Sequence, residues 1–335
     1  MILLSTITLI GYYDALHQNQ STMSKFRYSF IILFTLVVAF VGCAGGNSAE
    51  IDPTPTPAAI NTDLAPVRVG VLAIRSAEAA KNQYGGIINY LSETLGRPFE
   101  FVAVGQEPQF DEVAAGNLDF TLNNPLAAVQ LRRIHNTEFL VTLSRNNTGP
   151  EFGGLIIAKA GSGIETGTDL RGKRVTCVAF QTAAAGCNFQ VFHLLQQGVT
   201  VDEFAAFTET PSQDNIVLGV LNETFDAGFV RTGQLEKMVR EGTLLNSDEI
   251  VIVDLADDDF FFPHTTRLYP EWPFAAIEGT DPELVAAVRQ ALLELPEGHP
   301  ALANVNATGF VPAIDYTPLD DLIEQLELRG YDSER

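Results

Sequence analysis

From residue 67 onward, short apolar segments alternate with amphipathic segments, and this alternation constrains the fold more than any other feature of the sequence. The stretch VRVGVLA at 67–73 has the composition of a strand, and the segment at 77–95 that follows it carries Ile87, Ile88, Leu91 and Leu95 at helical spacing. Strands that alternate with helices indicate an α/β fold with mainly parallel sheets. We therefore predict an α/β protein.

The same pattern continues to the end of the chain. Strands are predicted at 67–73, 99–104, 118–122, 138–144, 153–159, 173–180, 226–230 and 250–255, and helices at 77–95, 125–134, 187–198, 212–223, 233–242, 282–295 and 318–328. A long central insert followed by a return of the chain predicts two lobes, with crossovers near 152–156 and 261–267 and a ligand cleft between the lobes. We expect residues 67–154 and 264–331 in lobe 1, and residues 155–263 in lobe 2.

The N-terminal part predicts export. A short basic segment at 23–29 precedes the apolar run at 30–42, which is shorter than the ~20 residues of a membrane-spanning helix. Gly42 before Cys43 resembles the bacterial lipoprotein box, although Phe40 stands where leucine is usual. Residues 1–43 are interpreted as an extension plus a lipoprotein signal peptide that starts at Met23, with lipidation of Cys43. An ordinary signal peptide and an uncleaved anchor remain alternatives.

Residues 44–66 are rich in Pro, Gly, Ala and Thr and are predicted to form a flexible linker, because such a segment buries too little apolar surface to fold. The expected location is therefore extracytoplasmic, with a lipid anchor in the bacterial cell membrane.

The net charge limits the partners. Forty-two acidic side chains against 20 basic ones give a formal charge of −22, which argues against nucleic acid as a partner. The charge does not exclude an anionic ligand, because a pocket can be locally positive in an acidic protein.

Candidate ligand-binding residues follow from one rule. Ligands in open α/β sheets bind beyond the carboxyl ends of strands, where the N–H groups of helix N-termini attract negative charge. Applied to the predicted strands, and to the polar segment on the return crossover, the rule selects Arg75, Asn123, Asn124, Thr182, Ala183, Ala184, Ala185, Gly186, Arg231, Thr232, His264, Thr265, Thr266 and Arg267. Alternatives stay open: Arg75 as a solvated side chain, the two asparagines as helix caps, and Arg267 as an inter-lobe salt bridge.

Other residues have simpler interpretations. Tyr269 and Trp272 are expected to pack in a core, and Phe152 to lie at a hinge or in the cleft. The acidic run at 257–259 is interpreted as a turn, and the five histidines have no metal-ligand spacing. No Gly-rich phosphate loop of the GxxxxGK[ST] kind is present, and we predict no metal and no cofactor.

Four segments in order carry a resemblance to a known family: GVLAIRSAEAA (70–80), AAGNLDFTLNNPLAAV (114–129), DLRGKRV (169–175) and DAGFVRTGQLEKM (226–238). They resemble the phosphonate/phosphite-type periplasmic substrate-binding proteins, which have the type II periplasmic-binding fold. The stretches at 261–277 and 311–331 resemble a narrower branch that includes the sensor domains of tetrathionate-type histidine kinases. The resemblance covers about 67–331.

The resemblance implies a hinged binding protein that closes over a small anion or polar solute, such as a phosphonate, a phosphite or a phosphate-like oxyanion, and delivers it to an ABC permease. The alternative is a sensory protein that partners a histidine kinase. Because no kinase segment follows Arg335, we expect a free-standing monomeric lipoprotein or the detached ligand-binding partner of a membrane protein. An enzyme with Cys187 as its nucleophile is a third hypothesis, disfavoured because His193 lies off the same helical face. The sequence does not name the ligand.

The stretch CVAFQTAAAGC at 177–187 departs from the family pattern. The family loop implied at this position is rich in serine, whereas here three alanines precede Gly186 and only Thr182 carries a hydroxyl. This weakens the implied phosphonate specificity more than the binding role. In an oxidising compartment, with Cys43 lipidated, Cys177 and Cys187 remain as one pair, and we predict a disulfide between them, with two small buried thiols as the alternative.

Overall fold

The computed structural model describes residues 60–332, which fall in one compact unit. The expectations for residues 1–43, lipidation of Cys43 and most of the linker at 44–66 lie outside the described residues. Within 60–332, no helix is both long and apolar enough to cross a membrane.

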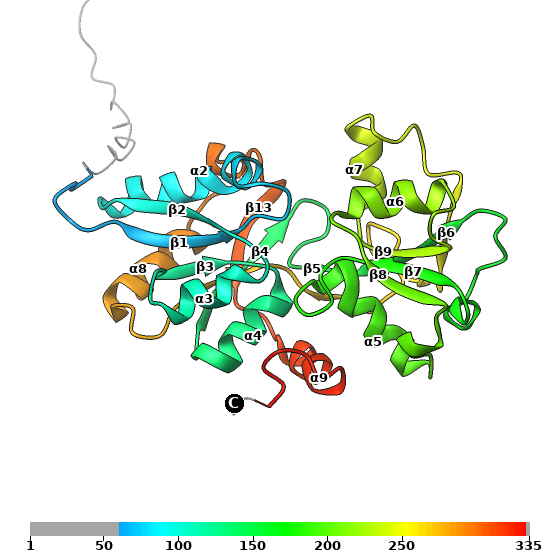
Figure 1. The fold of residues 1–335 in the computed structure, drawn as a ribbon. Coiled ribbons are helices and arrows are strands. Elements are labelled where there is room, and N and C mark those ends of the chain that lie inside the picture. The colour runs from blue at the N-terminus through cyan, green and yellow to red at the C-terminus, as the bar shows by residue number, and fades with distance from the viewer. Residues whose placement is uncertain (1–59, 333–335) are drawn as a thin grey trace, which may run out of the picture. The chain divides into compact units, whose positions relative to one another are not determined.

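The first sheet has six strands in the order β13-β4-β12-β3-β1-β2 (Figure 1). Its strands are β1 (Val67–Leu72), β2 (Phe99–Val104), β3 (Phe120–Leu122), β4 (Glu138–Arg145), β12 (Pro273–Ala276) and β13 (Ala307–Pro312). One face is covered by α2 (Ala77–Leu95) and α8 (Pro282–Leu293), and the other by α3 (Pro108–Ala114) and α4 (Pro125–His135). We call this sheet and its helices lobe 1.

The second sheet has five strands in the order β10-β6-β9-β7-β8. Its strands are β6 (Gly154–Lys159), β7 (Arg174–Cys177), β8 (Ala206–Glu209), β9 (Ala227–Arg231) and β10 (Ile250–Val253). Helix α5 (Phe189–Gln196) packs on one face, and α6 (Gln213–Leu221) and α7 (Gln234–Arg240) pack on the other. We call this sheet and its helices lobe 2.

The predicted α/β class is confirmed, but the expectation of mainly parallel sheets is wrong. Four strand pairs are parallel, β1–β2, β1–β3, β7–β8 and β7–β9, whereas six are antiparallel. Parallel neighbours need a crossover connection, and the parallel pairs lie at the β3-β1-β2 end of the first sheet and at the β9-β7-β8 end of the second. Strands that arrive from the other lobe, such as β6 and β12, run in the opposite direction to their neighbours.

Two short strands join the lobes. β5 (Glu151–Phe152) pairs antiparallel with β11 (Tyr269–Pro270), and Phe152 lies opposite Tyr269. The sequence placed these crossovers near 152–156 and 261–267. Tyr269 and Trp272 are both buried, as expected.

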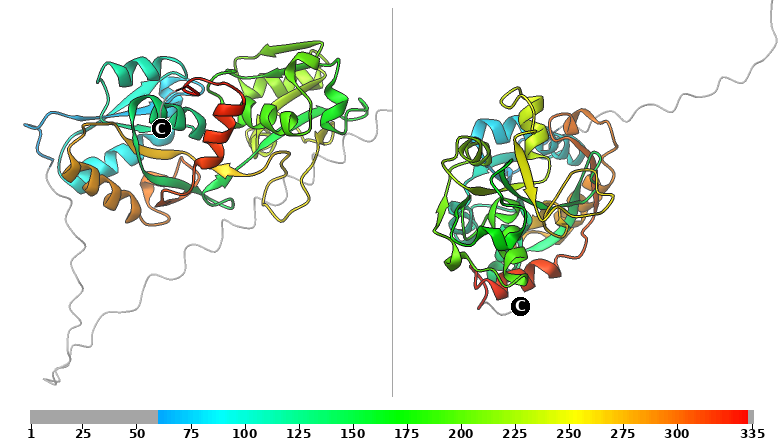
Figure 2. Two further views of the ribbon diagram at one scale, coloured as in Figure 1. Left: turned by 90° about the horizontal axis from the view of Figure 1, so that it is seen from below. Right: turned by 90° about the vertical axis from the view of Figure 1, so that its right-hand side faces the viewer.

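The C-terminal helix α9 (Thr317–Gln325) lies against α4 of lobe 1 and α5 of lobe 2, as the left view in Figure 2 shows from below. Leu126 of α4, Phe189 of α5 and Leu322 of α9 belong to one apolar cluster with the crossover aromatics. This cluster joins the two lobes at the β5–β11 crossovers.

Candidate functional site

The main cavity, of about 570 Å³, lies where the carboxyl ends of the parallel strands meet. Its volume is in the range of small-molecule sites. Residues that follow β1, β3, β7 and β8 contribute, as do the last residue of β9, the π-helical turn that precedes α5, the first residue of α6 and the cap of α4. The lining consists of Leu72, Ala73, Ile74, Gln106, Asn124, Phe152, Val178, Ala179, Ala183, Ala184, Ala185, Gly186, Glu209, Thr210, Pro211, Ser212, Gln213, Arg231 and Trp272.

At the lobe 1 wall, the N-terminus of α4 is organised by the two predicted asparagines. The Asn124 side chain caps the helix, because its Oδ1 accepts a hydrogen bond of 3.1 Å from the Ala127 N–H. Asn123 is fully buried; its Oδ1 accepts from the Asn124 N–H at 2.8 Å, and its amide donates to Gln109. Asn124 therefore both caps the helix and lines the cavity, whereas Asn123 holds Asn124 in place.

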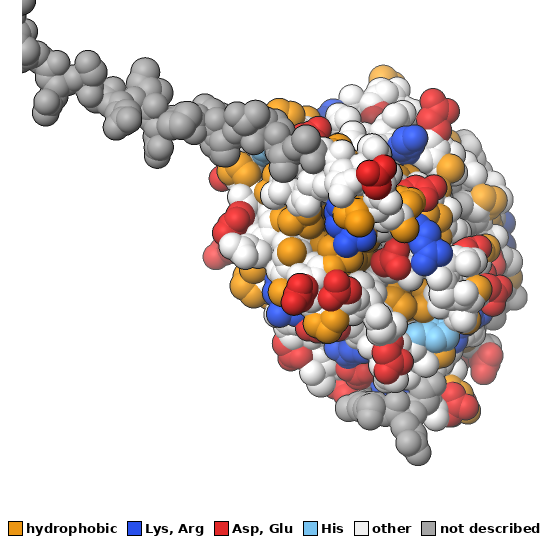
Figure 3. All heavy atoms as spheres, turned by 90° about the vertical axis from the view of Figure 1, so that its left-hand side faces the viewer, with side chains coloured by type: hydrophobic (Ala, Val, Ile, Leu, Met, Phe, Trp, Pro, Cys, Tyr) orange, Lys and Arg blue, Asp and Glu red, His pale blue; other side chains and the backbone are white. Residues whose placement is uncertain are grey.

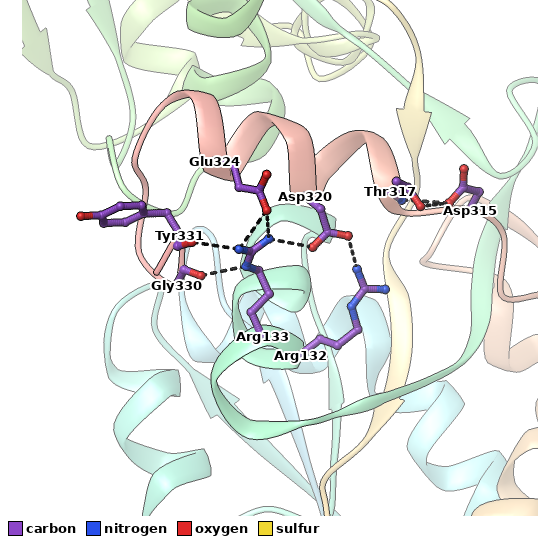
Figure 4. A network of polar contacts seen from close by, with 8 residues as sticks. All are labelled: Arg132, Arg133, Asp315, Thr317, Asp320, Glu324, Gly330 and Tyr331. Carbon is purple, nitrogen blue, oxygen red and sulfur yellow. Dashed lines mark hydrogen bonds and ion pairs between the residues drawn. The ribbon is translucent and has the colours of Figure 1, made fainter. Parts of the chain in front are cut away.

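The position of α4 is fixed at its other end by α9. Arg133, which is buried, donates to Asp320 and Glu324 and to the backbone carbonyls of Gly330 and Tyr331 (Figure 4). Arg132 donates to the second oxygen of Asp320 at 2.6 Å. The C-terminal segment thus ties down the helix whose N-terminus forms one wall of the cavity.

The lobe 2 wall is the loop that begins after β7. Cys177 and Cys187 form a disulfide with Cα atoms 5.0 Å apart, which confirms the predicted pair. Cys187 is therefore not a free thiol, and the alternative of a cysteine nucleophile is wrong. Within the loop, Ala179 has a left-handed backbone with φ of 39°, and the Val178 N–H bonds to the Gly186 carbonyl at 3.0 Å.

After the loop, a π-helical turn (Ala184–Asn188) leads directly into α5. First-turn N–H groups of a helix have no intrahelical acceptor and carry a partial positive charge. Ala184, Ala185 and Gly186 stand in this turn and line the cavity, so their backbone can face an anion. The side chains of the two alanines leave this part of the cavity open, because each is only a methyl group.

Two amide side chains keep this turn in place. Gln190 Nε2, with its two N–H groups, lies within hydrogen-bond distance of the carbonyls of Leu155, Ala185 and Val230, which joins α5 to the neighbouring strands β6 and β9. Asn188 Nδ2 donates to the carbonyls on either side of the loop, Phe180 at 2.9 Å and Ala183 at 2.8 Å. Thr182 is fully buried and donates to Glu107 of lobe 1 at 3.1 Å. The Thr182 hydroxyl therefore forms a hydrogen bond between the two lobes.

At the base of the cleft, Arg231 belongs to a buried charge triad with Arg145 and Glu271. Glu271 Oε1 accepts from Arg145 Nε at 2.8 Å and from Arg231 Nη2 at 3.1 Å, and Glu271 is 0% exposed. Two guanidinium groups against one carboxylate leave an excess positive charge. Burial lowers the pKa of Arg231, against the opposing effect of Glu271, and Arg145 lowers it further. An anion beside Arg231 would offset this charge.

Arg231 is held in place by neighbours of both lobes. Its guanidinium stacks over the Phe152 ring at 5.0 Å, and its backbone N–H donates to Gln213 Oε1 at 2.8 Å. Its Nε is buried without a hydrogen-bond partner. Trp272, beside Glu271, stacks on Tyr84 with ring centroids 5.5 Å apart.

Two more predicted residues lie in a neighbouring part of the cleft. Arg75 does not line the main cavity but bridges the lobes, with its Nη2 2.7 Å from Asp214 and 3.3 Å from Glu241. Thr232 is buried and accepts a hydrogen bond from the Gly153 N–H at 3.3 Å.

The predicted group at 264–267 lies away from the main cavity. Thr265 Oγ1 donates to Val253 and accepts from the Ile156 N–H, and Thr266 Oγ1 accepts from the Gly154 N–H. His264 is buried and contacts Asp258 at 3.0 Å, while Arg267 is exposed and stacks over Tyr269 at 5.5 Å. These side chains bind the crossover to the lobe 2 sheet. Asp258 belongs to the acidic run, and no group of three metal-ligating side chains occurs within residues 60–332.

Several residues in or beneath the cavity were missed in the sequence. Glu271 stands between Pro270 and Trp272 in an otherwise apolar stretch, which is a signal for a buried, paired charge. Ser212 and Gln213 follow β8, a strand that was not predicted, so the strand-end rule could not select them. Gln106 similarly follows β2 and lay within reach of the same rule.

Comparisons with known proteins agree with this architecture. The family model described as ABC transporter, phosphonate, periplasmic substrate-binding protein matches residues 69–317. The tetrathionate sensor histidine kinase TtrS of Salmonella typhimurium is 27% identical over 235 residues, which is 68% of this chain and 39% of that protein. The chain thus spans about two fifths of that relative.

Among solved structures, PhnD1 of Prochlorococcus marinus in complex with methylphosphonate has a TM-score of 0.64 at 15% identity, covering 78% of this chain and 98% of the other. A Xanthomonas citri protein bound to ATP has a TM-score of 0.64 at 18% identity, with 80% and 99% coverage. A binding protein component of an ABC phosphonate transporter from Pseudomonas aeruginosa has a TM-score of 0.61 at 17% identity, with 79% and 86% coverage. At such identities the similarity shows the fold, which is the predicted type II periplasmic-binding fold.

Proposed function

Because the chain belongs to the family of periplasmic substrate-binding proteins of phosphonate ABC transporters, we propose that it captures a small anion outside the cytoplasm and delivers it to an ABC permease. Proteins of this family bind solutes and are not enzymes. The proposed ligand is a phosphonate, phosphite, phosphate-like oxyanion or related anion, bound in the main cavity.

One observation carries the proposal: the main cavity joins the N-termini of three helices to Arg231, whose charge is only partly balanced by Glu271. Helix N-termini and guanidinium groups are the two groups that proteins use most for oxyanions. The alanine wall leaves room beside the anion, so the ligand can carry a substituent. Among the predicted site residues, Asn124, Ala183, Ala184, Ala185, Gly186 and Arg231 are the proposed contacts.

A thermal-shift screen of the full chain tests the proposal. The panel contains phosphate, phosphite, methylphosphonate, longer alkylphosphonates, sulfur oxyanions and small organic acids. At a ligand concentration 100 times Kd, binding stabilises the native state by about 2.7 kcal/mol and raises Tm. If no anion in the panel raises Tm, the proposal is wrong.

A matched pair of variants locates the ligand. Arg231→Met removes the proposed contact and leaves Arg145 paired with Glu271, and we expect about 10- to 100-fold weaker binding, the range for one charged hydrogen bond. Arg171→Met removes an exposed arginine that lines no part of the main cavity, and it should leave Kd unchanged. Equal effects of the two substitutions would contradict the proposed position.

We also propose that the lobes, 67–154 with 264–331 and 155–263, close over the ligand about the β5–β11 crossovers. In small-angle scattering, a saturating ligand should reduce the radius of gyration, whereas a rigid protein would show no change.

The proposed anchor is a lipid on Cys43, which the linker at 44–66 connects to the folded part. Mass spectrometry of the protein expressed in a bacterial host should find a diacylglyceryl group on Cys43, and Cys43→Ala should move the protein from the membrane fraction to the soluble fraction. A soluble wild-type protein with unmodified Cys43 would exclude the anchor.

A second candidate function is sensing with a partner kinase. It is favoured by the identity of 27% to a tetrathionate sensor histidine kinase. With a reconstituted partner, ligand-loaded protein that stimulates ATP hydrolysis by a permease complex supports import, whereas a change in kinase autophosphorylation supports sensing.

A further inference from the structure

A second cavity, of about 490 Å³, opens on the other side of Arg231 and is lined by an unusual number of cations. The cations are Arg75, Arg145, Arg231, Lys237 and Arg240. They come from the loop after β1, from β4, from the end of β9 and from α7, so both lobes contribute. We call this cavity the cationic basin.

The basin carries an excess of positive charge. Its five cations face three carboxylates, Glu241, Asp214 and Glu271. Glu241 also lines the basin, and Glu271 lies at the base of the cleft. Asp214 pairs with Arg75 and lies 3.6 Å from Lys237. The chain as a whole has a formal charge of −22. On the side of the molecule seen in Figure 3, acidic and basic side chains are interspersed. A pocket with a net positive charge in such a protein attracts anions selectively.

Several of these cations lack a complete set of partners. Among the described residues, Arg240 has no ion-pair partner, and Arg231 Nε is buried without a hydrogen bond. Burial lowers the pKa of Lys237 despite Asp214, and the Arg75 guanidinium lowers it further. An anionic group in the basin would relieve this mutual repulsion.

Neutral donors complete the lining. Asn82 and Gln83 of α2 line the basin, as do Asn146, Thr148 and Asn306. Backbone and amide donors of this kind commonly accompany arginine at oxyanion sites.

The basin is continuous with the main cavity. A narrow cavity of about 170 Å³ shares Ile74, Gln213 and Trp272 with the main cavity, and it shares Arg75 and Lys237 with the basin. Arg231 lines all three. The cleft thus has an apolar end and a cationic end.

We propose that the cationic basin is a second anion-binding site, which takes one oxyanion group between Lys237 and Arg240 of lobe 2 and Arg75 of lobe 1. Two sources supply this chemistry: a free inorganic oxyanion, or a second anionic group on the solute in the main cavity. The site goes beyond the proposed function, because a free oxyanion can occupy it whether or not the main cavity is filled.

Calorimetric titration of the full chain at one fixed ionic strength tests the site with three probes. Sulfate represents a free oxyanion, propylphosphonate a solute with one anionic group, and 3-phosphonopropionate a solute of similar length with two. The variant Lys237→Met/Arg240→Gln removes two basin cations. The control Lys173→Met/Arg171→Gln removes the same charges elsewhere on lobe 2, where they line neither cavity.

We expect the basin variant to weaken sulfate or 3-phosphonopropionate binding at least tenfold, and propylphosphonate binding less than twofold. An effect on sulfate identifies a free oxyanion, and an effect confined to 3-phosphonopropionate identifies a second anionic group of the solute. If the basin variant weakens neither probe more than the control variant does, the basin is not an anion site.

The probes also separate this inference from the proposed function. Propylphosphonate that binds with no basin effect on the other probes overturns the basin and leaves the proposed function intact. Sulfate that binds through the basin while no anion of the thermal-shift panel binds in the main cavity supports the basin and overturns the proposed function. In crystals soaked with selenate, an anomalous peak within hydrogen-bond distance of Lys237 or Arg240 would confirm a free oxyanion in the basin directly, and a peak only elsewhere would exclude the free oxyanion as the source.

Discussion

The loop at 182–186 and the crossover segment at 264–267 look equally suited to ligand binding in the sequence, but they have different places in the structure. The loop, with three alanines, lines the main cavity. The crossover segment, with a histidine, two threonines and an arginine, does not, because Thr265 and Thr266 bond to the backbone of the lobe 2 sheet. A polar side chain beside a sheet often satisfies backbone groups, whereas a small side chain leaves N–H groups and space accessible. The comparison predicts that changes in the loop alter binding and that changes in the crossover segment alter stability.

The largest expected effect comes from the disulfide that closes the loop. Cys177→Ala/Cys187→Ala should lower the free energy of unfolding by about 3 kcal/mol, the value for a closed loop of this length, and it should also weaken binding. Urea unfolding measures the first effect and titration the second. The wild-type protein in reductant should match the variant, and the variant should not respond to reductant. Unchanged stability and unchanged Kd would contradict the role of the disulfide.

The second-largest effect should come from a substitution in the loop that fills the cavity, and it should appear in the binding affinity. Ala184→Leu places a larger side chain in the cavity wall, and we expect at least 100-fold weaker binding of the best anion, which corresponds to about 2.8 kcal/mol. Ala205→Leu, in a chain segment that does not line the cavity, serves as the control. Normal binding by Ala184→Leu would place the ligand elsewhere.

The crossover segment should show the opposite pattern. Thr265→Val leaves the Ile156 N–H and the Val253 carbonyl without their side-chain partner, so the free energy of unfolding should fall by about 1–3 kcal/mol while Kd changes less than threefold. The exposed Thr224→Val should change neither quantity. A large change in Kd with unchanged stability would make Thr265 a ligand contact and remove the distinction between the segments.

The smallest effect concerns the Arg75–Asp214 pair, which joins the lobes outside both segments. Burial alone would raise the pKa of Asp214, but Lys237, Gln234 and Arg75 together lower it below its ordinary value of 3.8. The stabilisation is therefore complete above pH 3.8 and is lost as the pH falls through the lower folded-state pKa.

Because the pair is partly exposed, its contribution should stay below about 1 kcal/mol. Asp214→Asn should remove this part of the acid dependence of unfolding, and the exposed Asp248→Asn should not. An acid dependence that is identical in Asp214→Asn and in the wild-type protein would show that the pair contributes nothing.

Periodicity in the sequence predicted the elements that pack on one face against a sheet. Helix α2 was predicted at its observed bounds, 77–95, because its apolar residues recur at helical spacing and Ser76 caps its first turn. The strand β8 was missed because its residues 206–209 alternate weakly and lie at the edge of the sheet. Missing this strand also hid Ser212 and Gln213 from the list of candidate residues.

The candidate site was predictable only where one local rule sufficed. Asn124 lies just after β3 and Arg231 is the last residue of β9, and both line the cavity, as the strand-end rule requires. The partner of Arg231 could not be read from the sequence, because Glu271 is 40 residues away and only the folding of β11 and β12 brings it to the base of the cleft. The hydrogen bonds of Thr265 to backbone groups were equally unpredictable from the sequence, because they depend on where the crossover meets the sheet.

The disulfide between Cys177 and Cys187 also sets the moment at which the binding loop matures. Thiols stay reduced in the cytoplasm, and disulfides form in oxidising compartments outside it. The newly made chain would therefore carry an open loop while it is surrounded by the phosphate and metabolite anions of the cell. The loop would close only after export, so the protein would reach its working place unloaded and acquire its full capacity to bind there.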